Sequence, residues 1–369
     1  MTAQRVVFAK FLGQDIFLEQ GRLLFSLFHA FVTSGYQVMF FDHTPEGGLE
    51  EYGRAALELD GVTKTTHVPA NGDESLYLFD EEDPSLAGRP WRRKIKVDFD
   101  VFSPYWLEPP IIMPFPMHPV HAMRGVDQRL ETFREGRKNK RVFFSGDTKD
   151  YRRNRVRYPK PKLPRLKIVN IIRERMSEDT LVVDDLAVLD GLGEAGYTNK
   201  CVLVDTDRIW VDDKIWPDML ATADFFLAPP GIVMPMCHNI VEAMAVGCVP
   251  ITNYPEWFDP ALTPMENCIA FDGEDDLLAK LRLALRMPVE QIRSMRAKVL
   301  SYYERYLRPA NFIRRVEDAP QNPVTVLLIT EKNMARRPKK LGRWSVLIKG
   351  TVNRGNERGL RRALSLLLE

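Results

Sequence analysis

A histidine, an asparagine and a glutamate lie in the first turns of a helix predicted over residues 238–246. A strand ending in a Pro/Gly loop precedes this helix, and Gly247 ends it before another apolar strand. The first N–H groups of a helix lack partners within it and carry partial positive charge, so they attract phosphate. We therefore expect a diphosphate at His238 and Asn239, and we expect Glu242 to accept hydrogen bonds from ribose hydroxyls.

A second cluster follows the predicted strand that ends at Gly146. Glycine lets the backbone approach a phosphate closely, and Lys149 and Arg152 lie just beyond it. Cations here would neutralise the negative charge that develops on a departing nucleoside diphosphate. The spacing is not that of a P-loop or of a G-x-G-x-x-G dinucleotide site. Each arginine alone is as expected in a solvated loop, whereas the cluster as a set favours anion binding.

Two domains are needed to position these residues, because 369 residues exceed one ordinary core. Residues 6–9, 18–33 and 36–41 read as strand, helix and strand, which implies a parallel sheet. Residues 43–98 are predicted as loops and helices, and another strand is predicted to end at 100–104. The alternation of short strands and helices resumes at 141. We predict an α/β protein with two Rossmann-like, doubly wound domains that face each other across a cleft.

The predicted domain limits are 1–135 for an acceptor-side domain, 136–320 for a nucleotide-sugar domain and 321–369 for a basic extension. Residues 134–175 hold sixteen Lys or Arg against four acids, and residues 331–369 hold eleven against three. The C-terminal segment is predicted either to pack on the first domain or to lie as a basic amphipathic helix on an anionic membrane.

The run HNIVEAMAVGCVPI after ADFFLAPPG resembles the nucleotide-sugar segment of GT-B glycosyltransferases. Within that group its sequence is most similar to exostosin-like transferases, and it also resembles Kdo transferases. The resemblance implies that Glu242 contacts the ribose, and that Pro230, Gly231, His238 and Asn239 hold the donor. It further implies sugar transfer from a nucleotide sugar to a hydroxyl of a glycan or lipid-linked acceptor, in polysaccharide assembly. Retaining members carry a second glutamate eight residues earlier, where this chain has Met234, so the stereochemistry stays open.

Transfer with inversion needs a group that takes the acceptor hydroxyl proton. Asp15 is the first candidate and Glu19 the second, although either could serve only as a first-turn acid for the helix that follows. His118 and His121 could also face the cleft. No C-x-x-C or H-E-x-x-H pattern occurs, so we expect neither a metal nor another cofactor besides the nucleotide sugar.

Two other functions are compatible with parts of this sequence. A basic nucleic-acid-binding protein would explain the cationic stretch, but it does not explain the residues of the helix at 238–246. A non-catalytic scaffold that only binds nucleotide sugars is the other alternative. The absence of an apolar stretch of membrane-spanning length and of C-x-x-C spacing among four cysteines favours a cytoplasmic location, with membrane contact only at the periphery.

Overall fold

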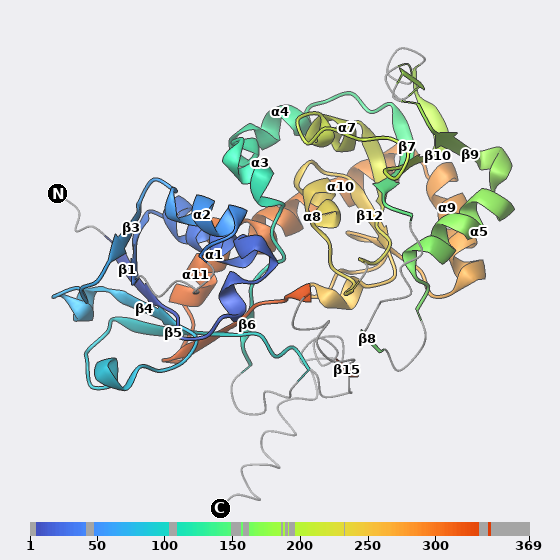
Figure 1. Ribbon diagram of the computed structural model, residues 1–369. Coiled ribbons are helices and arrows are strands. Elements are labelled where there is room, and N and C mark those ends of the chain that lie inside the picture. The colour runs from blue at the N-terminus through green and yellow to red at the C-terminus, as the bar shows by residue number, and fades with distance from the viewer. Residues whose placement is uncertain are drawn as a thin grey trace, which may run out of the picture.

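The computed structural model describes residues 5–41, 48–102, 109–148, 162–185, 196–231 and 233–331, with short pieces at 156–157, 187–188, 191 and 339–340. Two parallel sheets, of seven and six strands, form two α/β domains side by side (Figure 1). This confirms the predicted two-domain Rossmann-like arrangement, which is that of the GT-B fold. No helix among these residues is long and apolar enough to cross a bilayer.

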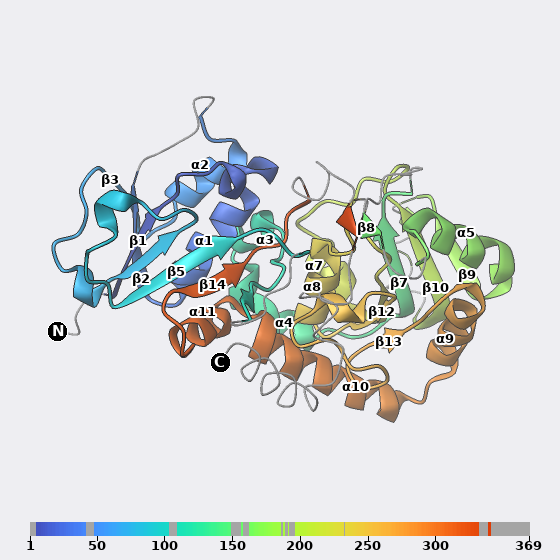
Figure 2. The same cartoon turned by 90° about the horizontal axis from the view of Figure 1, so that it is seen from below.

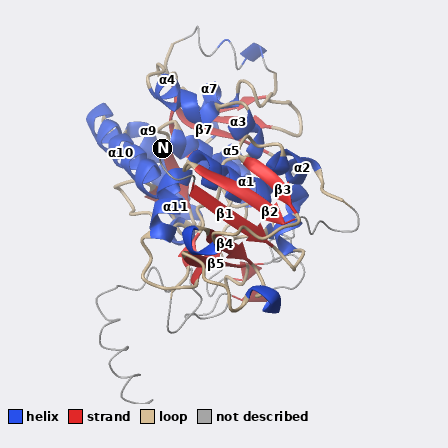
Figure 3. Ribbon diagram, turned by 90° about the vertical axis from the view of Figure 1, so that its left-hand side faces the viewer, coloured by secondary structure: helices blue, strands red, loops and turns tan. Residues whose placement is uncertain are grey.

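The first sheet has the strand order β3-β2-β1-β4-β5-β14-β6, with every neighbouring pair parallel. Its strands are β1 (Arg5–Lys10), β2 (Tyr36–Phe41), β3 (Val62–Thr65), β4 (Leu76–Phe79), β5 (Arg93–Asp98), β6 (Ile111–Ile112) and β14 (Val324–Leu327). Helices α1 (Arg22–Thr33), α2 (Glu51–Leu57) and α11 (Pro309–Glu317) belong to this domain. Figure 3 shows α1 and α11 against the strands.

The second sheet has the order β13-β12-β11-β7-β10-β9 and is also parallel. Its strands are β7 (Lys140–Gly146), β9 (Thr180–Val183), β10 (Thr198–Asp205), β11 (Ala223–Leu227), β12 (Val249–Thr252) and β13 (Ile269–Ala270). The helices of this domain are α5 (Arg165–Arg175), α7 (Trp216–Ala221), α8 (His238–Ala245), α9 (Glu274–Arg286) and α10 (Val289–Tyr302). Figures 1 and 2 show α5 and α9 away from α7 and α8, so helices lie on both faces.

A linker that carries α3 (Pro119–Met123) and α4 (Leu130–Arg134) joins the domains, and the chain later returns to the first domain. After α10 it continues through α11 into β14, which is inserted between β5 and β6. Leu328 belongs to the core of the first domain, while Leu327 and Ile329 belong to that of the second. The predicted extension at 321–369 thus begins inside this returning segment. Apart from Lys339 and Lys340, which form the short strand β15 (Lys339–Lys340), its basic residues lie outside the described part.

The first βαβ unit is confirmed, but α1 begins later than predicted. Glu19, Gln20 and Gly21 all have left-handed φ values, of 58°, 62° and 82°. This conformation is unfavourable for side chains other than glycine, so the turn interrupts what the apolar spacing reads as one continuous helix. A Cβ at Gly21 would lie 2.3 Å from the backbone nitrogen of Gly53, which explains why glycine closes the turn.

The prediction of loops and helices alone over residues 43–98 is wrong, since β3, β4 and β5 lie there. Strand β5 alternates charged residues with the buried Ile95 and Val97 and ends at Asp98, before the predicted strand end at 100–104. Short strands with one polar face give only a weak sequence signal.

Candidate functional site

A cavity of about 280 Å³ lies beside the carboxyl ends of β7 and β10. The described walls come from five segments: the linker, the end of β7, the start of α5, the 206–216 segment between β10 and the start of α7, and the start of α8. Ligands of parallel α/β sheets bind at this edge, where connections leave in opposite directions. The linker wall consists of His118 and His121, as expected for histidines that face the cleft.

The start of α8 is open toward this cavity. Cys237 precedes the helix without a side-chain hydrogen bond that caps it, while His238 and Asn239 line the cavity. The His238 Nδ1–H donates to the carbonyl oxygen of Pro116 at 2.8 Å, and Asn239 Nδ2 donates to that of Ser145 at 3.4 Å. The side chains are thereby oriented by neighbouring segments, and the first backbone N–H groups of α8 can donate hydrogen bonds to an anion.

Gly146 lines the cavity at the end of β7, with Arg165 beside it. Arg165 Nε donates to the carbonyl oxygen of Pro230 at 3.1 Å, and its Nη1 donates to that of Asp147 at 3.4 Å. Arg165 therefore joins the loop after β7 to the loop before α8 and supplies a cation to the cavity.

The predicted cations Lys149 and Arg152 lie outside the described residues, so their roles stay predictions. Arg165 belongs to the same basic stretch. The sequence feature that could have indicated Arg165 is its position directly after Pro164, at the start of a helix.

Pro230 and Gly231 belong to the loop before α8. They are not among the described residues that line the cavity. The Gly231 N–H donates to the carbonyl oxygen of Pro235 at 3.0 Å. A Cβ at Gly231 would lie 2.5 Å from the carbonyl oxygen of Met234, so only glycine fits this turn. Met234 occupies the position where retaining enzymes carry a glutamate. Its side chain is fully buried, and an apolar residue suits such an environment.

Glu242 lines the cavity but is only 5% exposed. Its Oε1 accepts from the backbone N–H of His118 at 2.9 Å, and its Oε2 accepts from the indole N–H of Trp216 at 2.6 Å. His121 Nε2 lies 3.6 Å from Oε1. Glu242 thus ties the linker and α7 to α8, and its predicted contact with a ribose stays a prediction.

Burial shapes the charges in this cavity. Burial raises the pKa of Glu242, whereas the His121 charge and the N–H groups of His118 and Trp216 lower it. It lowers the pKa of His238 to about 3 and that of His118 to about 4, so both rings are neutral at neutral pH. Among the residues that the structure describes, no three His, Cys, Asp or Glu side chains are grouped as a metal site requires.

The two predicted proton acceptors do not line this cavity in the described structure. Asp15 lines a separate hollow of about 310 Å³ at the carboxyl ends of β1, β4 and β5, together with Asp80, Glu81 and Asp98. Glu19 sits in the left-handed turn before α1. Both residues therefore lie on the first domain, and their catalytic roles stay predictions.

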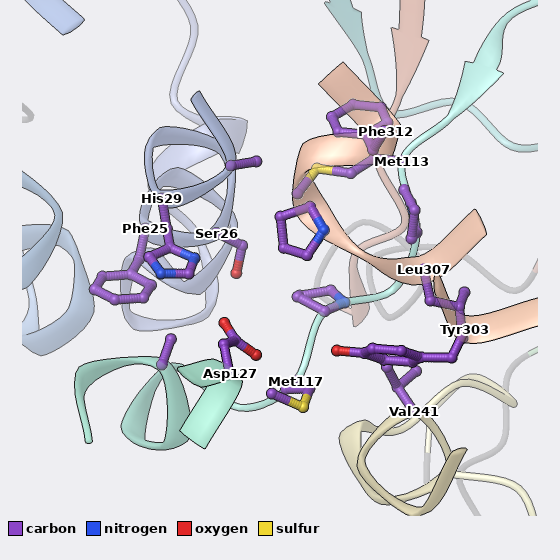
Figure 4. Close-up of a pocket in the computed structure, with 15 residues that line it drawn as sticks. Phe25, Ser26, His29, Met113, Met117, Asp127, Val241, Tyr303, Leu307 and Phe312 are labelled. Atoms are coloured by element: carbon purple, nitrogen blue, oxygen red, sulfur yellow. The ribbon is translucent and has the colours of Figure 1, made fainter. Parts of the chain in front are cut away.

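A third cavity, of about 40 Å³, lies at the seam between the domains. His29 of α1 and Asp127 of the linker point toward it, with Tyr303 on the side of the second domain (Figure 4). Burial lowers the pKa of His29 and raises that of Asp127. Since one water needs about 10–15 Å³, this space has the volume of a few water molecules and is too small for a nucleoside.

No family model matches the chain, and no curated protein sequence matches it. Several solved structures are similar over most of its length. A glycosyltransferase from Rickettsia africae aligns with a TM-score of 0.47 and 6% identity, covering 86% of this chain and 98% of the other. Trehalose-6-phosphate synthase OtsA aligns with a TM-score of 0.43 and 10% identity, covering 85% and 99%.

HepE from Anabaena, in complex with UDP and glucose, aligns with a TM-score of 0.39 and 11% identity, covering 85% of this chain and 98% of the other. The TM-scores of these superpositions are low, so the backbones match only approximately. The function proposed below therefore rests on the residues of this chain.

We predict that Glu242→Gln destabilises the protein by about 1–3 kcal/mol, because an amide presents one oxygen and leaves one of two buried N–H donors without an acceptor. Urea unfolding followed by circular dichroism measures the change. Glu131→Gln is the control, since its side chain is 80% exposed. An unchanged midpoint for Glu242→Gln would show that its two hydrogen bonds do not hold the linker.

Stability is also expected to fall as the pH drops from about 6.5 toward 4. The unfolded chain binds protons on His238 and His118 in this window, whereas the folded chain, with lowered pKa values for both, does not. The melting temperature at pH 7.5, 6.5 and 5.5 tests this. His238→Asn, whose amide N–H can replace Nδ1–H, should flatten the dependence, and the exposed His67→Asn should not. Equal slopes in the two variants would contradict the assignment.

Proposed function

We propose that this protein is a glycosyltransferase that moves a sugar from a nucleotide-sugar donor to an acceptor hydroxyl. The observation that carries the proposal is the convergence of an uncapped helix start, a glycine-lined strand end and an arginine on one cavity at the switch point of a parallel sheet. Each of these groups favours phosphate, and together they fit a diphosphate.

The donor would lie with its diphosphate at the start of α8, between Gly146 and Arg165. Sugar transfer breaks the bond between the sugar C1 and the diphosphate oxygen, and the electron pair remains on the diphosphate. The α8 N–H groups and Arg165 are positioned to stabilise that charge. The remaining cavity, toward Trp216 and Glu242, would take the nucleoside.

The acceptor would approach from the first domain. Its hydroxyl oxygen attacks C1 while a base takes its proton, and Asp15 or Glu19 remain the candidate bases on that side. A glycan or lipid-linked acceptor is proposed from the sequence resemblance, and the basic C-terminal segment would suit contact with an anionic membrane.

A thermal-shift panel of UDP, GDP, ADP, TDP and CMP sugars tests the proposal. We expect one donor class to raise the melting temperature, because a ligand at about 100 times its Kd stabilises by about 2.7 kcal/mol. Arg165→Ala should weaken binding of that donor at least about tenfold, the worth of a charge-assisted contact. Arg293→Ala, whose side chain is 71% exposed, serves as the control.

The proposal fails if no nucleotide sugar raises the melting temperature, or if Arg165→Ala binds the donor as tightly as the unmodified protein. Tight, salt-dependent binding of DNA or RNA in place of nucleotide sugars would favour the nucleic-acid alternative. Donor binding with neither hydrolysis nor transfer would favour a scaffold.

A further inference from the structure

Glu331 ends the returning segment at the seam between the two domains. The Leu328 N–H donates to the carbonyl oxygen of Asp98 at 2.8 Å, which fixes the segment to the carboxyl end of β5. Leu328 belongs to the first core, Ile329 belongs to the second, and Thr330 is 1% exposed. Figures 1 and 2 both show the chain after β14 between the two domains. Glu331 therefore follows directly on residues that are fixed to both domains.

Charged residues from both domains act on Glu331. Arg165 begins α5 of the second domain and lines the donor cavity, whereas Arg22 begins α1 of the first domain. Glu19 lies in the turn before α1. The charges of all three residues act on the Glu331 carboxylate. Since salt screens charges that are more than about 10 Å apart, this carboxylate lies in the space between the starts of α1 and α5.

A series of ring contacts connects Arg22 to the donor cavity. The guanidinium carbon of Arg22 lies 5.7 Å from the centroid of the Tyr52 ring, and that ring lies 5.3 Å from the ring of His118. The His118 ring lies 5.1 Å from that of His238, and both histidines line the cavity. The start of α1 therefore lies beside the donor cavity, and the carboxylate of Glu331 lies near that start.

The carboxylate oxygens of Glu331 are available to a ligand. The residue is partly exposed, and no described residue donates a hydrogen bond to its side chain or forms an ion pair with it. By contrast, the two oxygens of Asp80, at the carboxyl end of β4, accept from the N–H groups of Leu12 and Gly13 at 2.9 Å each. Glu331 can therefore accept a hydrogen bond, or a proton, from a hydroxyl group.

The surroundings of Glu331 also suit a base. Burial raises the pKa of Glu331 and the charge of Glu19 adds to this effect, whereas the charges of Arg22 and Arg165 lower it. A carboxylate with a raised pKa accepts a proton more readily, provided that it is ionised at the working pH. The two arginines favour that ionised form.

We infer that Glu331 is the catalytic base, which takes the proton from the acceptor hydroxyl. This inference rests on the proposed function. The hydroxyl oxygen bonds to the sugar C1 while its proton passes to the Glu331 carboxylate. The bond between C1 and the diphosphate oxygen breaks, and its electron pair stays on the diphosphate beside Arg165. Such a single displacement inverts the configuration at C1. Asp15, by comparison, lines the separate hollow on the first domain.

The test uses water as the acceptor. The donor is the UDP, GDP, ADP, TDP or CMP sugar that raises the melting temperature most, and its hydrolysis is followed by release of the nucleotide. Glu331→Gln should slow hydrolysis about a hundredfold or more, the usual contribution of a general base. Binding of the released nucleotide, measured by calorimetry, should not weaken, because the substitution removes a negative charge near Arg165. Glu290→Gln is the control, since its side chain is 81% exposed.

Sodium azide separates the role of a base from a structural role. Azide attacks C1 as an anion and has no proton to lose, so it needs no base. We expect azide to restore part of the turnover of Glu331→Gln by forming a glycosyl azide of inverted configuration. In the unmodified protein and in Glu290→Gln, azide should add little to the rate. Restored turnover would also show that Glu331→Gln folds and binds the donor.

The inference is overturned if Glu331→Gln hydrolyses the donor at the rate of the unmodified protein. It is also overturned if nucleotide binding weakens in parallel with hydrolysis, if azide restores no turnover, or if the azide product retains the configuration of the donor. An unmodified protein that binds a donor without hydrolysing it would contradict a base at this position. If no nucleotide sugar binds to the unmodified protein, the proposed function itself fails.

Discussion

The buried carboxylate of Glu242 is the interaction on which the donor cavity depends. It accepts from the linker at His118 and from α7 at Trp216, while its own helix α8 provides the phosphate end of the cavity. Removing a charge from water is costly unless hydrogen bonds replace the water, and breaking a buried arrangement of this kind exposes the uncompensated cost. The geometry of three walls is thereby linked to one side chain.

The described lining of the cavity combines cationic, neutral and acidic groups. Helix N–H groups and Arg165 attract phosphate, and the neutral ring of His238 adds no charge beside them. The returning segment through α11 and β14, which contacts both domain cores, ties the two sides of the cleft together.

The sequence predicted those parts whose signal is local. The strand that ends at Gly146, the helix at 238–246 and the first βαβ unit have strong local signals, and their positions held to within a few residues except for the start of α1. Strand β14 could not be found this way, because its insertion beside β5 depends on a contact across the whole chain. Arg165 could not be predicted, because its role depends on reaching the carbonyl oxygen of Pro230. Nothing in the sequence indicates that both carboxylate oxygens of Glu242 accept hydrogen bonds from the protein.

A crystal structure of the protein with its best-binding nucleoside diphosphate would test the central claim most directly. The account predicts the diphosphate within hydrogen-bond distance of the first N–H groups of α8 and beside Arg165. A nucleotide bound elsewhere, for example in the hollow at Asp15 and Asp80, with the start of α8 unliganded, would contradict it.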